Sequence, residues 1–90
     1  MKYFAAFLKM KDLEKNASLR PQHIDFLLQN EKEGNIFARG RFTDGKGGLV
    51  IYMAPSLDVA VKIAESDPYV KSGARTLEVF EWDMKVASGA

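Results

Sequence analysis

Runs of apolar residues divide the first half of the chain into strands and connections. Residues 2–10 and 49–54 are apolar at both odd and even positions, as in strands that are covered on both faces of a sheet. Residues 35–42 instead alternate between apolar and polar side chains, which is the period of a half-exposed strand. The glycine-rich segment 43–48 separates the last two stretches and predicts a hairpin loop that pairs them antiparallel.

The first helix is predicted over residues 21–33. Pro21 is favourable at the first position of a helix, where its missing amide hydrogen costs nothing, and Gly34 can adopt the left-handed conformation that ends many helices. The preceding residues 11–19 are polar and predict a connecting loop. The core-facing side of the helix is predicted to hold Arg20, Ile24, Leu27 and Leu28, with His23 at its border.

A second helix and a last strand follow. Ser56 is a favourable N-cap, and apolar residues recur at helical spacing up to about Ser66, where Asp67 precedes a proline and leaves the helical conformation. Residues 75–85 predict a strand whose apolar positions change phase, which indicates either a bulge or apolar cover on both sides. Residues 86–90 are expected to form a disordered tail.

These elements follow one another as strand, helix, strand, strand, helix, strand, without an internal repeat. The order predicts one α+β domain, residues 1–90, with the ferredoxin-like βαββαβ two-layer sandwich. Right-handed crossovers then place the first and third strands in the centre of the sheet, which agrees with their apolar side chains on both faces. Two helices cover only one face of such a sheet, so we expect a homodimer that closes the open sheet face.

Composition restricts the classes of partner. The chain has 13 lysine and arginine residues against 12 aspartate and glutamate residues, so it lacks the positive field that attracts nucleic acid. It has no cysteine and no apolar run of membrane-spanning length, and we expect a cytoplasmic protein that binds neither membrane nor nucleic acid. A single histidine predicts no metal site, and the absence of a phosphate-binding motif predicts no nucleotide cofactor. A small neutral or weakly charged molecule is the expected ligand.

His23 is the only histidine, and it lies near the start of the first predicted helix. In the ferredoxin-like order the second helix ends at the same edge of the sheet, which brings Asp67 to His23. A carboxylate bonded to an imidazole fixes its tautomer, so that the other ring nitrogen can act as an acid or a base. The alternative is structural, with His23 as a half-buried, hydrogen-bonded residue and Asp67 as a turn former before Pro68.

Two short segments carry a family resemblance: Arg20-Pro21-Gln22-His23, and Asp67-Pro68-Tyr69-Val70 followed by Gly73. With these segments in this order, the sequence resembles the YciI-like (YCII-related) family over nearly its whole length. The resemblance implies a dimeric α+β barrel with an active site at His23 and Asp67. It also implies similarity to small ring-modifying enzymes such as muconolactone isomerases and dehydrochlorinases. One difference is that Gly40 is followed by Arg41, where many relatives have proline.

We therefore predict acid/base chemistry on a small organic molecule, an isomerisation or an elimination, with His23 and Asp67 as the catalytic pair. The alternative is a dimer that binds or senses a small ligand without turnover. The expected substrate-binding residues are Arg20, Gly40, Arg41 and Tyr69. Arg41 is suited to hold an acidic substrate through two parallel hydrogen bonds, although protection of an edge strand from aggregation explains this residue and Arg39 equally well.

Overall fold

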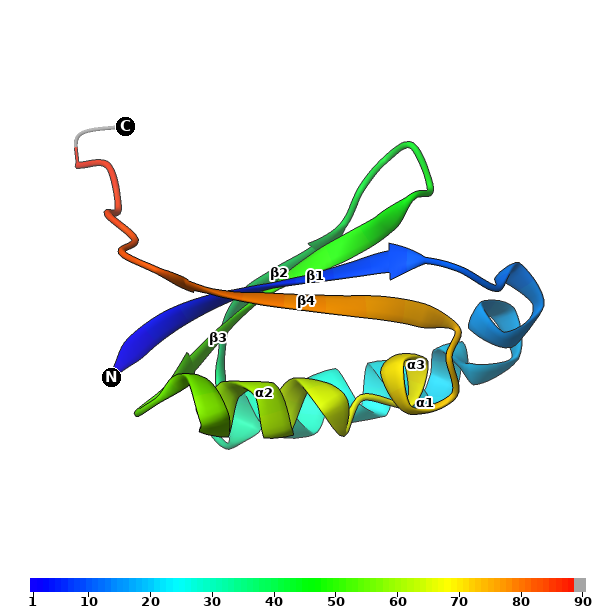
Figure 1. Ribbon diagram of the computed structural model, residues 1–90, viewed down its shortest axis with the longest axis horizontal. Helices are drawn as coiled ribbons and strands as arrows, with labels where there is room; N and C mark the ends of the chain where they lie inside the picture. Colours follow the sequence, from blue (N-terminus) through cyan, green and yellow to red (C-terminus); the bar gives the residue numbers. More distant parts are fainter. Residues whose placement is uncertain (89–90) are drawn as a thin grey trace.

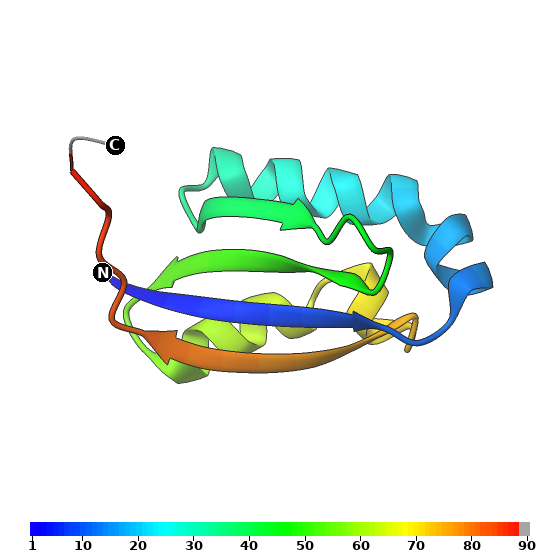
Figure 2. The same ribbon diagram turned by 90° about the horizontal axis from the view of Figure 1, so that it is seen from above.

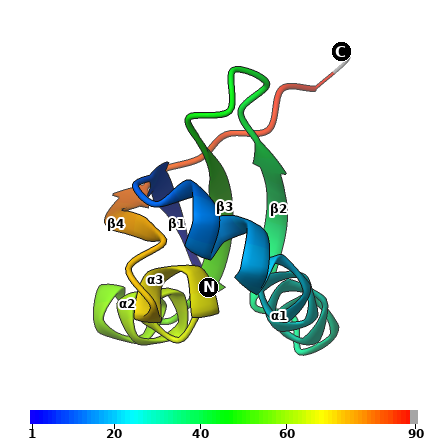
Figure 3. The same cartoon turned by 90° about the vertical axis from the view of Figure 1, so that its right-hand side faces the viewer.

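In the computed structural model, which describes residues 1–88, four strands form one antiparallel sheet and three helices lie on one of its faces (Figure 1, Figure 3). The elements follow the chain as β1 (Lys2–Met10), α1 (Leu13–Lys32), β2 (Ile36–Arg41), β3 (Gly47–Ala54), α2 (Leu57–Glu65), α3 (Pro68–Lys71) and β4 (Arg75–Trp82). The strand order in the sheet is β2-β3-β1-β4. The predicted ferredoxin-like α+β fold is confirmed, with the first and third strands in the centre.

Helix α1 begins at Leu13 rather than at Pro21, so the connecting loop predicted over residues 11–19 is wrong. Asp12 is the N-cap of this helix, and its carboxylate accepts a hydrogen bond of 3.0 Å from the backbone N–H of Lys15. Pro21 therefore lies inside the helix, where it has no amide hydrogen to continue the hydrogen-bond ladder. The first turns of α1 run in a different direction from the remainder (Figure 2), as expected for a bend at a proline.

The buried face of α1 is rotated from the predicted one. His23, Leu27 and Asn30 are its buried residues. Leu28, predicted on this face, is 51% exposed. The two polar residues can be buried because each has a partner: His23 is bonded to Asp67, and the Asn30 side chain donates to a backbone carbonyl one turn earlier. A pattern of apolar residues gives no weight to polar side chains that are paired in the fold, which explains the rotation.

The chain after β3 forms two helices where one was predicted. Ser56 is the N-cap of α2, as expected, and this helix ends at Glu65. Asp67 has extended backbone angles of φ −63° and ψ 128° before Pro68, and its side chain caps the short helix α3. Pro68 occupies the first turn of α3, where proline is favoured. The proline that ends one helix thus starts the next, with the Asp67 carboxylate at the junction.

Strand β4 pairs with β1 in one continuous register along its whole length, so it contains no bulge. The phase change in its apolar residues instead supplies side chains to both faces of the sheet. Phe80 and Trp82, which are 54% and 44% exposed, lie on the face that carries no helix. The register does shift in the edge strand β2, between Ile36 and Ala38.

The core lies between the sheet and the helices. Phe4 and Leu8 of β1 are at most 1% exposed, and Tyr52 of β3 is buried in the same layer. Ala60 and Ala64 are the buried residues of α2, and their small side chains let this helix lie close to the sheet. Among residues 1–88, no helix is long and apolar enough to cross a membrane.

The end of the chain was predicted to be a disordered tail over residues 86–90. Residues 86–88 belong to no helix or strand, and residues 89–90 lie outside the described residues.

Candidate functional site

His23 and Asp67 are 44 positions apart in the sequence and are hydrogen-bonded in the interior of the protein. The Nδ1 atom of His23 lies 2.8 Å from Oδ1 of Asp67, and the two side chains are 9% and 0% exposed. The same Oδ1 accepts a hydrogen bond of 2.9 Å from the backbone N–H of Tyr69, as the N-cap of α3. One carboxylate oxygen therefore joins the start of a helix to the ring of a histidine.

Tyr69 fixes the ring of His23 from a second side. The two rings are stacked, with centroids 3.8 Å apart and 16° between their planes. An ionised carboxylate only accepts hydrogen bonds, so the pair places the proton of neutral His23 on Nδ1. Nε2 is left with a free lone pair on a ring that lines a cavity. In this arrangement a histidine can accept a proton from a ligand.

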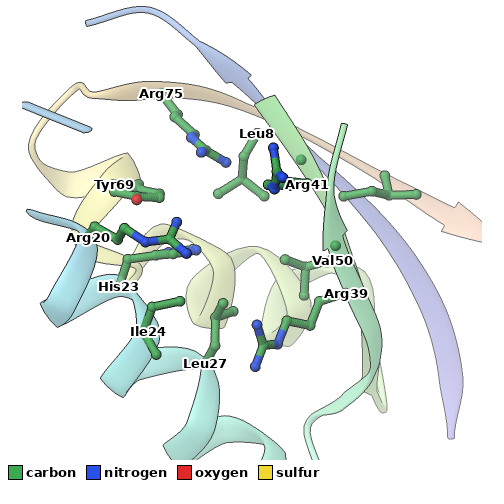
Figure 4. Close-up of a pocket in the computed structure, with 13 residues that line it drawn as sticks. Leu8, Arg20, His23, Ile24, Leu27, Arg39, Arg41, Val50, Tyr69 and Arg75 are labelled. Atoms are coloured by element: carbon green, nitrogen blue, oxygen red, sulfur yellow. The ribbon is translucent and has the colours of Figure 1, made fainter. Parts of the chain in front are cut away.

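The cavity has a volume of about 260 Å³ and lies between α1, the β2–β3 hairpin and the start of β4 (Figure 4). Part of its wall is apolar and consists of Leu8, Ile24, Leu27, Leu49 and Val50. A cavity of roughly 150 Å³ accommodates benzene. The space beside His23 is therefore sufficient for a single substituted ring or a short chain.

Four arginine side chains also line the cavity, and no carboxylate does: Arg20 of α1, Arg39 and Arg41 of β2, and Arg75 of β4. Arg39 is neutralised by Glu31, with Nε and Oε2 2.8 Å apart. Within residues 1–88, the salt bridges include none of the other three arginines. The same residues contain no group of three histidine, cysteine or acidic side chains that could hold a metal ion. The cavity is therefore suited to an anion.

Arg75 is the residue of the cavity that the sequence analysis missed. It is only 9% exposed, its Nε donates to Oδ1 of Asn16 at 2.9 Å, and its guanidinium carbon lies 4.4 Å from the centroid of the Tyr69 ring. Burial is the largest cause of the lowered pKa of Arg75; the side chains of Tyr69 and Asp67 oppose this shift, and the charge of Arg20 adds to it. The only sequence signal that could have indicated Arg75 is its position at the start of the last strand, which lies at the same edge of the sheet as His23.

Gly48 makes room for Arg75. A Cβ atom at position 48 would lie 3.3 Å from Nη1 of Arg75 and 2.8 Å from the backbone oxygen of Gly40. A Cβ atom at Gly40 would instead have no atom within 4 Å. The glycine with a steric role at this cavity is therefore Gly48, whereas the sequence analysis selected Gly40.

The structure brings the predicted site residues to one place. Of the predicted residues, five line the cavity: Arg20, His23, Gly40, Arg41 and Tyr69. Asp67 is fully buried and is bonded to His23. Three buried polar atoms near this pair have no hydrogen-bond partner among the described residues: the hydroxyls of Tyr52 and Tyr69, and Oδ2 of Asp67. Burial, and then the charge of Asp67, raise the pKa of Tyr52 above its ordinary value, so its hydroxyl stays neutral. The roles of these residues towards a ligand remain predictions.

Comparison with known proteins gives one family and one fold. The family described as YCII-related domain matches residues 1–83. The uncharacterized protein YjpA of Bacillus subtilis (strain 168) is 36% identical over 85 residues, which are 92% of this chain and 98% of that protein. Among solved structures, 5-chloro-2-hydroxyhydroquinone dehydrochlorinase of Burkholderia phenoliruptrix, in complex with 2,5-dihydroxybenzoquinone, has a TM-score of 0.78 at 21% identity. This similarity covers 92% of this chain and 95% of that one, and it establishes a shared fold.

Proposed function

Since the chain belongs to the YCII-related domain family, we propose that it is an enzyme for a small organic molecule in which His23 moves a proton and Asp67 orients its ring. The observation that carries this proposal is the 2.8 Å bond between Nδ1 of His23 and Oδ1 of Asp67 at the wall of a cavity. A histidine buried only for stability needs no access to a cavity, whereas this ring lines one. The competing function is binding or sensing of a small ligand without turnover.

Proton transfer would begin at Nε2 of His23. With Nδ1–H donated to Asp67, Nε2 takes a proton from a ligand atom next to an electron-withdrawing group, and the carboxylate stabilises the resulting imidazolium. In an elimination, the electrons of the broken C–H bond form a double bond, and the leaving group departs with its bonding pair. In an isomerisation, His23 returns the proton to another atom of the same molecule. Both reactions use one acid/base group.

The solved structure with this fold supports the class of reaction and supplies a first test substrate. It is named a dehydrochlorinase, an enzyme that removes hydrogen chloride, and the molecule bound to it is a single substituted ring. A ring of that size fits a cavity of about 260 Å³. We therefore choose 5-chloro-2-hydroxyhydroquinone as the test substrate and chloride release as the assay.

Three variants test the His23–Asp67 pair in this assay. His23→Gln and Asp67→Asn are each expected to lower kcat by about 100- to 10,000-fold, the usual contribution of a positioned acid/base group. The double variant should cost little more, because the two residues act as one unit. Asp25→Asn, on the exposed side of α1, is the matched control and should keep the activity of the wild type. Unchanged turnover in His23→Gln would show that the proposed role is wrong, and tight binding without turnover by the wild type would favour a sensing function.

We also propose that the protein is a homodimer joined through the face of the sheet that carries no helix. Large apolar side chains on this face are between 38% and 54% exposed: Phe37, Phe42, Phe80 and Trp82. Phe37 of β2 and Phe42 just after it pack edge-on against the β1 residues Tyr3 and Phe7, with centroids 5.3 Å and 5.7 Å apart. The aromatic surface therefore extends over the intervening strand β3. Monomers rarely leave a contiguous surface of this kind open. A second copy covers it by two-fold symmetry, the commonest arrangement of oligomers.

A further inference from the structure

Arg75 is a buried charge that forms no salt bridge within the described part of the chain. The side chain is 9% exposed, yet no salt bridge among residues 1–88 includes it. Its neighbours are the neutral amide oxygen of Asn16 and the face of the Tyr69 ring. Removing a charge from water is costly unless an opposite charge replaces the lost hydration. The charge of Asp67 acts on Arg75, but this carboxylate is already bonded to His23, so an anion in the cavity would supply the missing direct counter-charge.

The guanidinium group is held in one position rather than free to move. Its Nε is bonded to Asn16 at 2.9 Å, the Tyr69 ring lies 4.4 Å away, and Gly48 leaves space beside Nη1. Figure 4 shows its terminal nitrogens directed into the cavity. A guanidinium fixed in this way presents parallel N–H donors that match the two oxygens of a carboxylate.

The remaining cavity lining determines what kind of anion fits. Arg20 and Arg41 add two positive charges to that of Arg75, whereas Arg39 is already paired with Glu31. Beside these charges lie the apolar side chains of the cavity wall, which a bare inorganic anion would leave without contact. A ligand that satisfies both parts of the lining has an anionic oxygen group at one end and an apolar body at the other.

We propose that the ligand of this cavity is a small organic acid, of about one ring in size, whose anionic oxygens bind the guanidinium of Arg75. Arg20 and Arg41 lie on the same cavity and supply a second, more exposed layer of positive charge. The acid group is thereby placed within one cavity with Nε2 of His23. This inference rests on the proposal that the cavity is the functional site, but it does not depend on the reaction.

Binding of two matched probes tests the charge requirement. Benzoate and benzamide have the same ring and nearly the same shape, but only benzoate is charged at pH 7. Isothermal titration calorimetry on the wild type should give tighter binding of benzoate by about 10- to 150-fold, the range expected for charge-assisted hydrogen bonds. Equal affinities for the two probes would overturn the proposal. Inorganic phosphate binding as tightly as benzoate would overturn the organic part of it.

Substitution of the arginines tests the assignment to Arg75. Arg75→Met should remove most of the preference for benzoate, whereas Arg39→Met, in which an already paired charge is lost, should change it by less than about threefold. A larger loss in Arg41→Met than in Arg75→Met would overturn the assignment. Arg75→Met should fold, because the buried charge it removes has no acidic partner. Arg75→Lys is the second variant: it keeps the charge but loses the parallel donors, and undiminished benzoate affinity in it would contradict the proposed contact.

The same titration separates this proposal from the proposed reaction. His23→Gln should retain the preference for benzoate over benzamide, because the acid group is proposed to bind Arg75 and not His23. A His23→Gln variant that loses chloride release and keeps the preference supports both proposals. Loss of the preference in His23→Gln would show that the histidine, and not Arg75, binds the anion.

Discussion

Replacing Asp67 with alanine removes one oxygen atom that holds two elements together. Oδ1 of Asp67 accepts the Nδ1–H of His23 at 2.8 Å and the backbone N–H of Tyr69 at 2.9 Å. The first bond connects α1 to the junction before α3, and the second caps α3. Both donors become unpaired in Asp67→Ala, in a region where the Asp67 side chain has no exposed surface.

The expected loss of stability follows from these contacts. The cap of α3 contributes about 1 kcal/mol. The bond to His23, in which the acceptor is a buried carboxylate, contributes about 1.5–3 kcal/mol. Oδ2 of Asp67 is buried without a partner, so its removal recovers about 1 kcal/mol of unfavourable desolvation. The net loss in the free energy of unfolding is about 1.5–3 kcal/mol, which lowers Tm by roughly 6–24 °C for a domain of this size.

Denaturation in urea at one fixed protein concentration measures this loss, since dissociation of a dimer also contributes to the apparent stability. Asp12→Ala is the matched control. The Asp12 side chain caps α1 through one bond of 3.0 Å to Lys15 and has no second hydrogen-bond partner within residues 1–88, so its loss should cost about 1 kcal/mol. His23→Phe keeps the stack on Tyr69, and combined with Asp67→Ala it should give a coupling energy of about 1 kcal/mol or more. Equal losses in Asp67→Ala and Asp12→Ala, or strictly additive effects of the pair, would refute the reasoning.

Three further predictions concern other parts of the structure. Because the pKa of Tyr52 is raised in the folded protein, above pH about 10 the unfolded chain loses a proton that the folded protein keeps, and stability should fall as pH rises further. In thermal denaturation from pH 9 to 11, the Tm of Tyr52→Phe should fall less than that of the wild type. Parallel plots of Tm against pH for the two proteins would exclude the effect. Gly48→Ala should lower the free energy of unfolding by about 1–3 kcal/mol, because its Cβ meets a backbone oxygen at 2.8 Å, whereas Gly40→Ala should be close to neutral. In light scattering at micromolar concentration, the wild type should have the mass of a dimer and Phe80→Glu that of a monomer. The control Leu28→Glu, on the exposed side of α1, should keep the mass of a dimer, and a wild-type monomer would contradict the proposed interface.

Most of the fold could be predicted because alternation and apolar runs report on burial directly. The strands of the sheet and the Ser56 cap were found from such local signals, and the sheet order followed from the handedness of crossovers. The start of α1 was missed because Pro21 is most often a first-turn residue, and here the helix continues through it with a bend. The short helix α3 was missed because four residues are too few to show a helical period.

The candidate site also has a part that the sequence predicts and a part that it does not. The meeting of His23 and Asp67 could be predicted because the topology alone brings the two helix ends to one edge. Arg75 could not, because its burial depends on a contact with Asn16, 59 positions away, on a turn of α1 that was read as a loop. An arginine at the start of a strand is normally solvent-exposed, and only the three-dimensional packing shows that this one is not.

The bend at Pro21 divides α1 into two parts that are held differently. The later part carries His23 and Leu27 into the core. Residues 13–20 include none of the buried residues of α1. They are attached through partly buried Leu19 and through polar contacts such as Lys15 Nζ to the Ser72 carbonyl at 3.1 Å and Asn16 to Arg75. Because Pro21 cannot donate to the carbonyl of the preceding turn, opening of the first part breaks fewer bonds than opening of the second. We expect amide hydrogens in residues 13–20 to exchange faster than those in residues 24–32. The wall of the cavity that bears Arg20 thus belongs to the part of α1 that opens more readily, whereas His23 lies in the part that opens less readily.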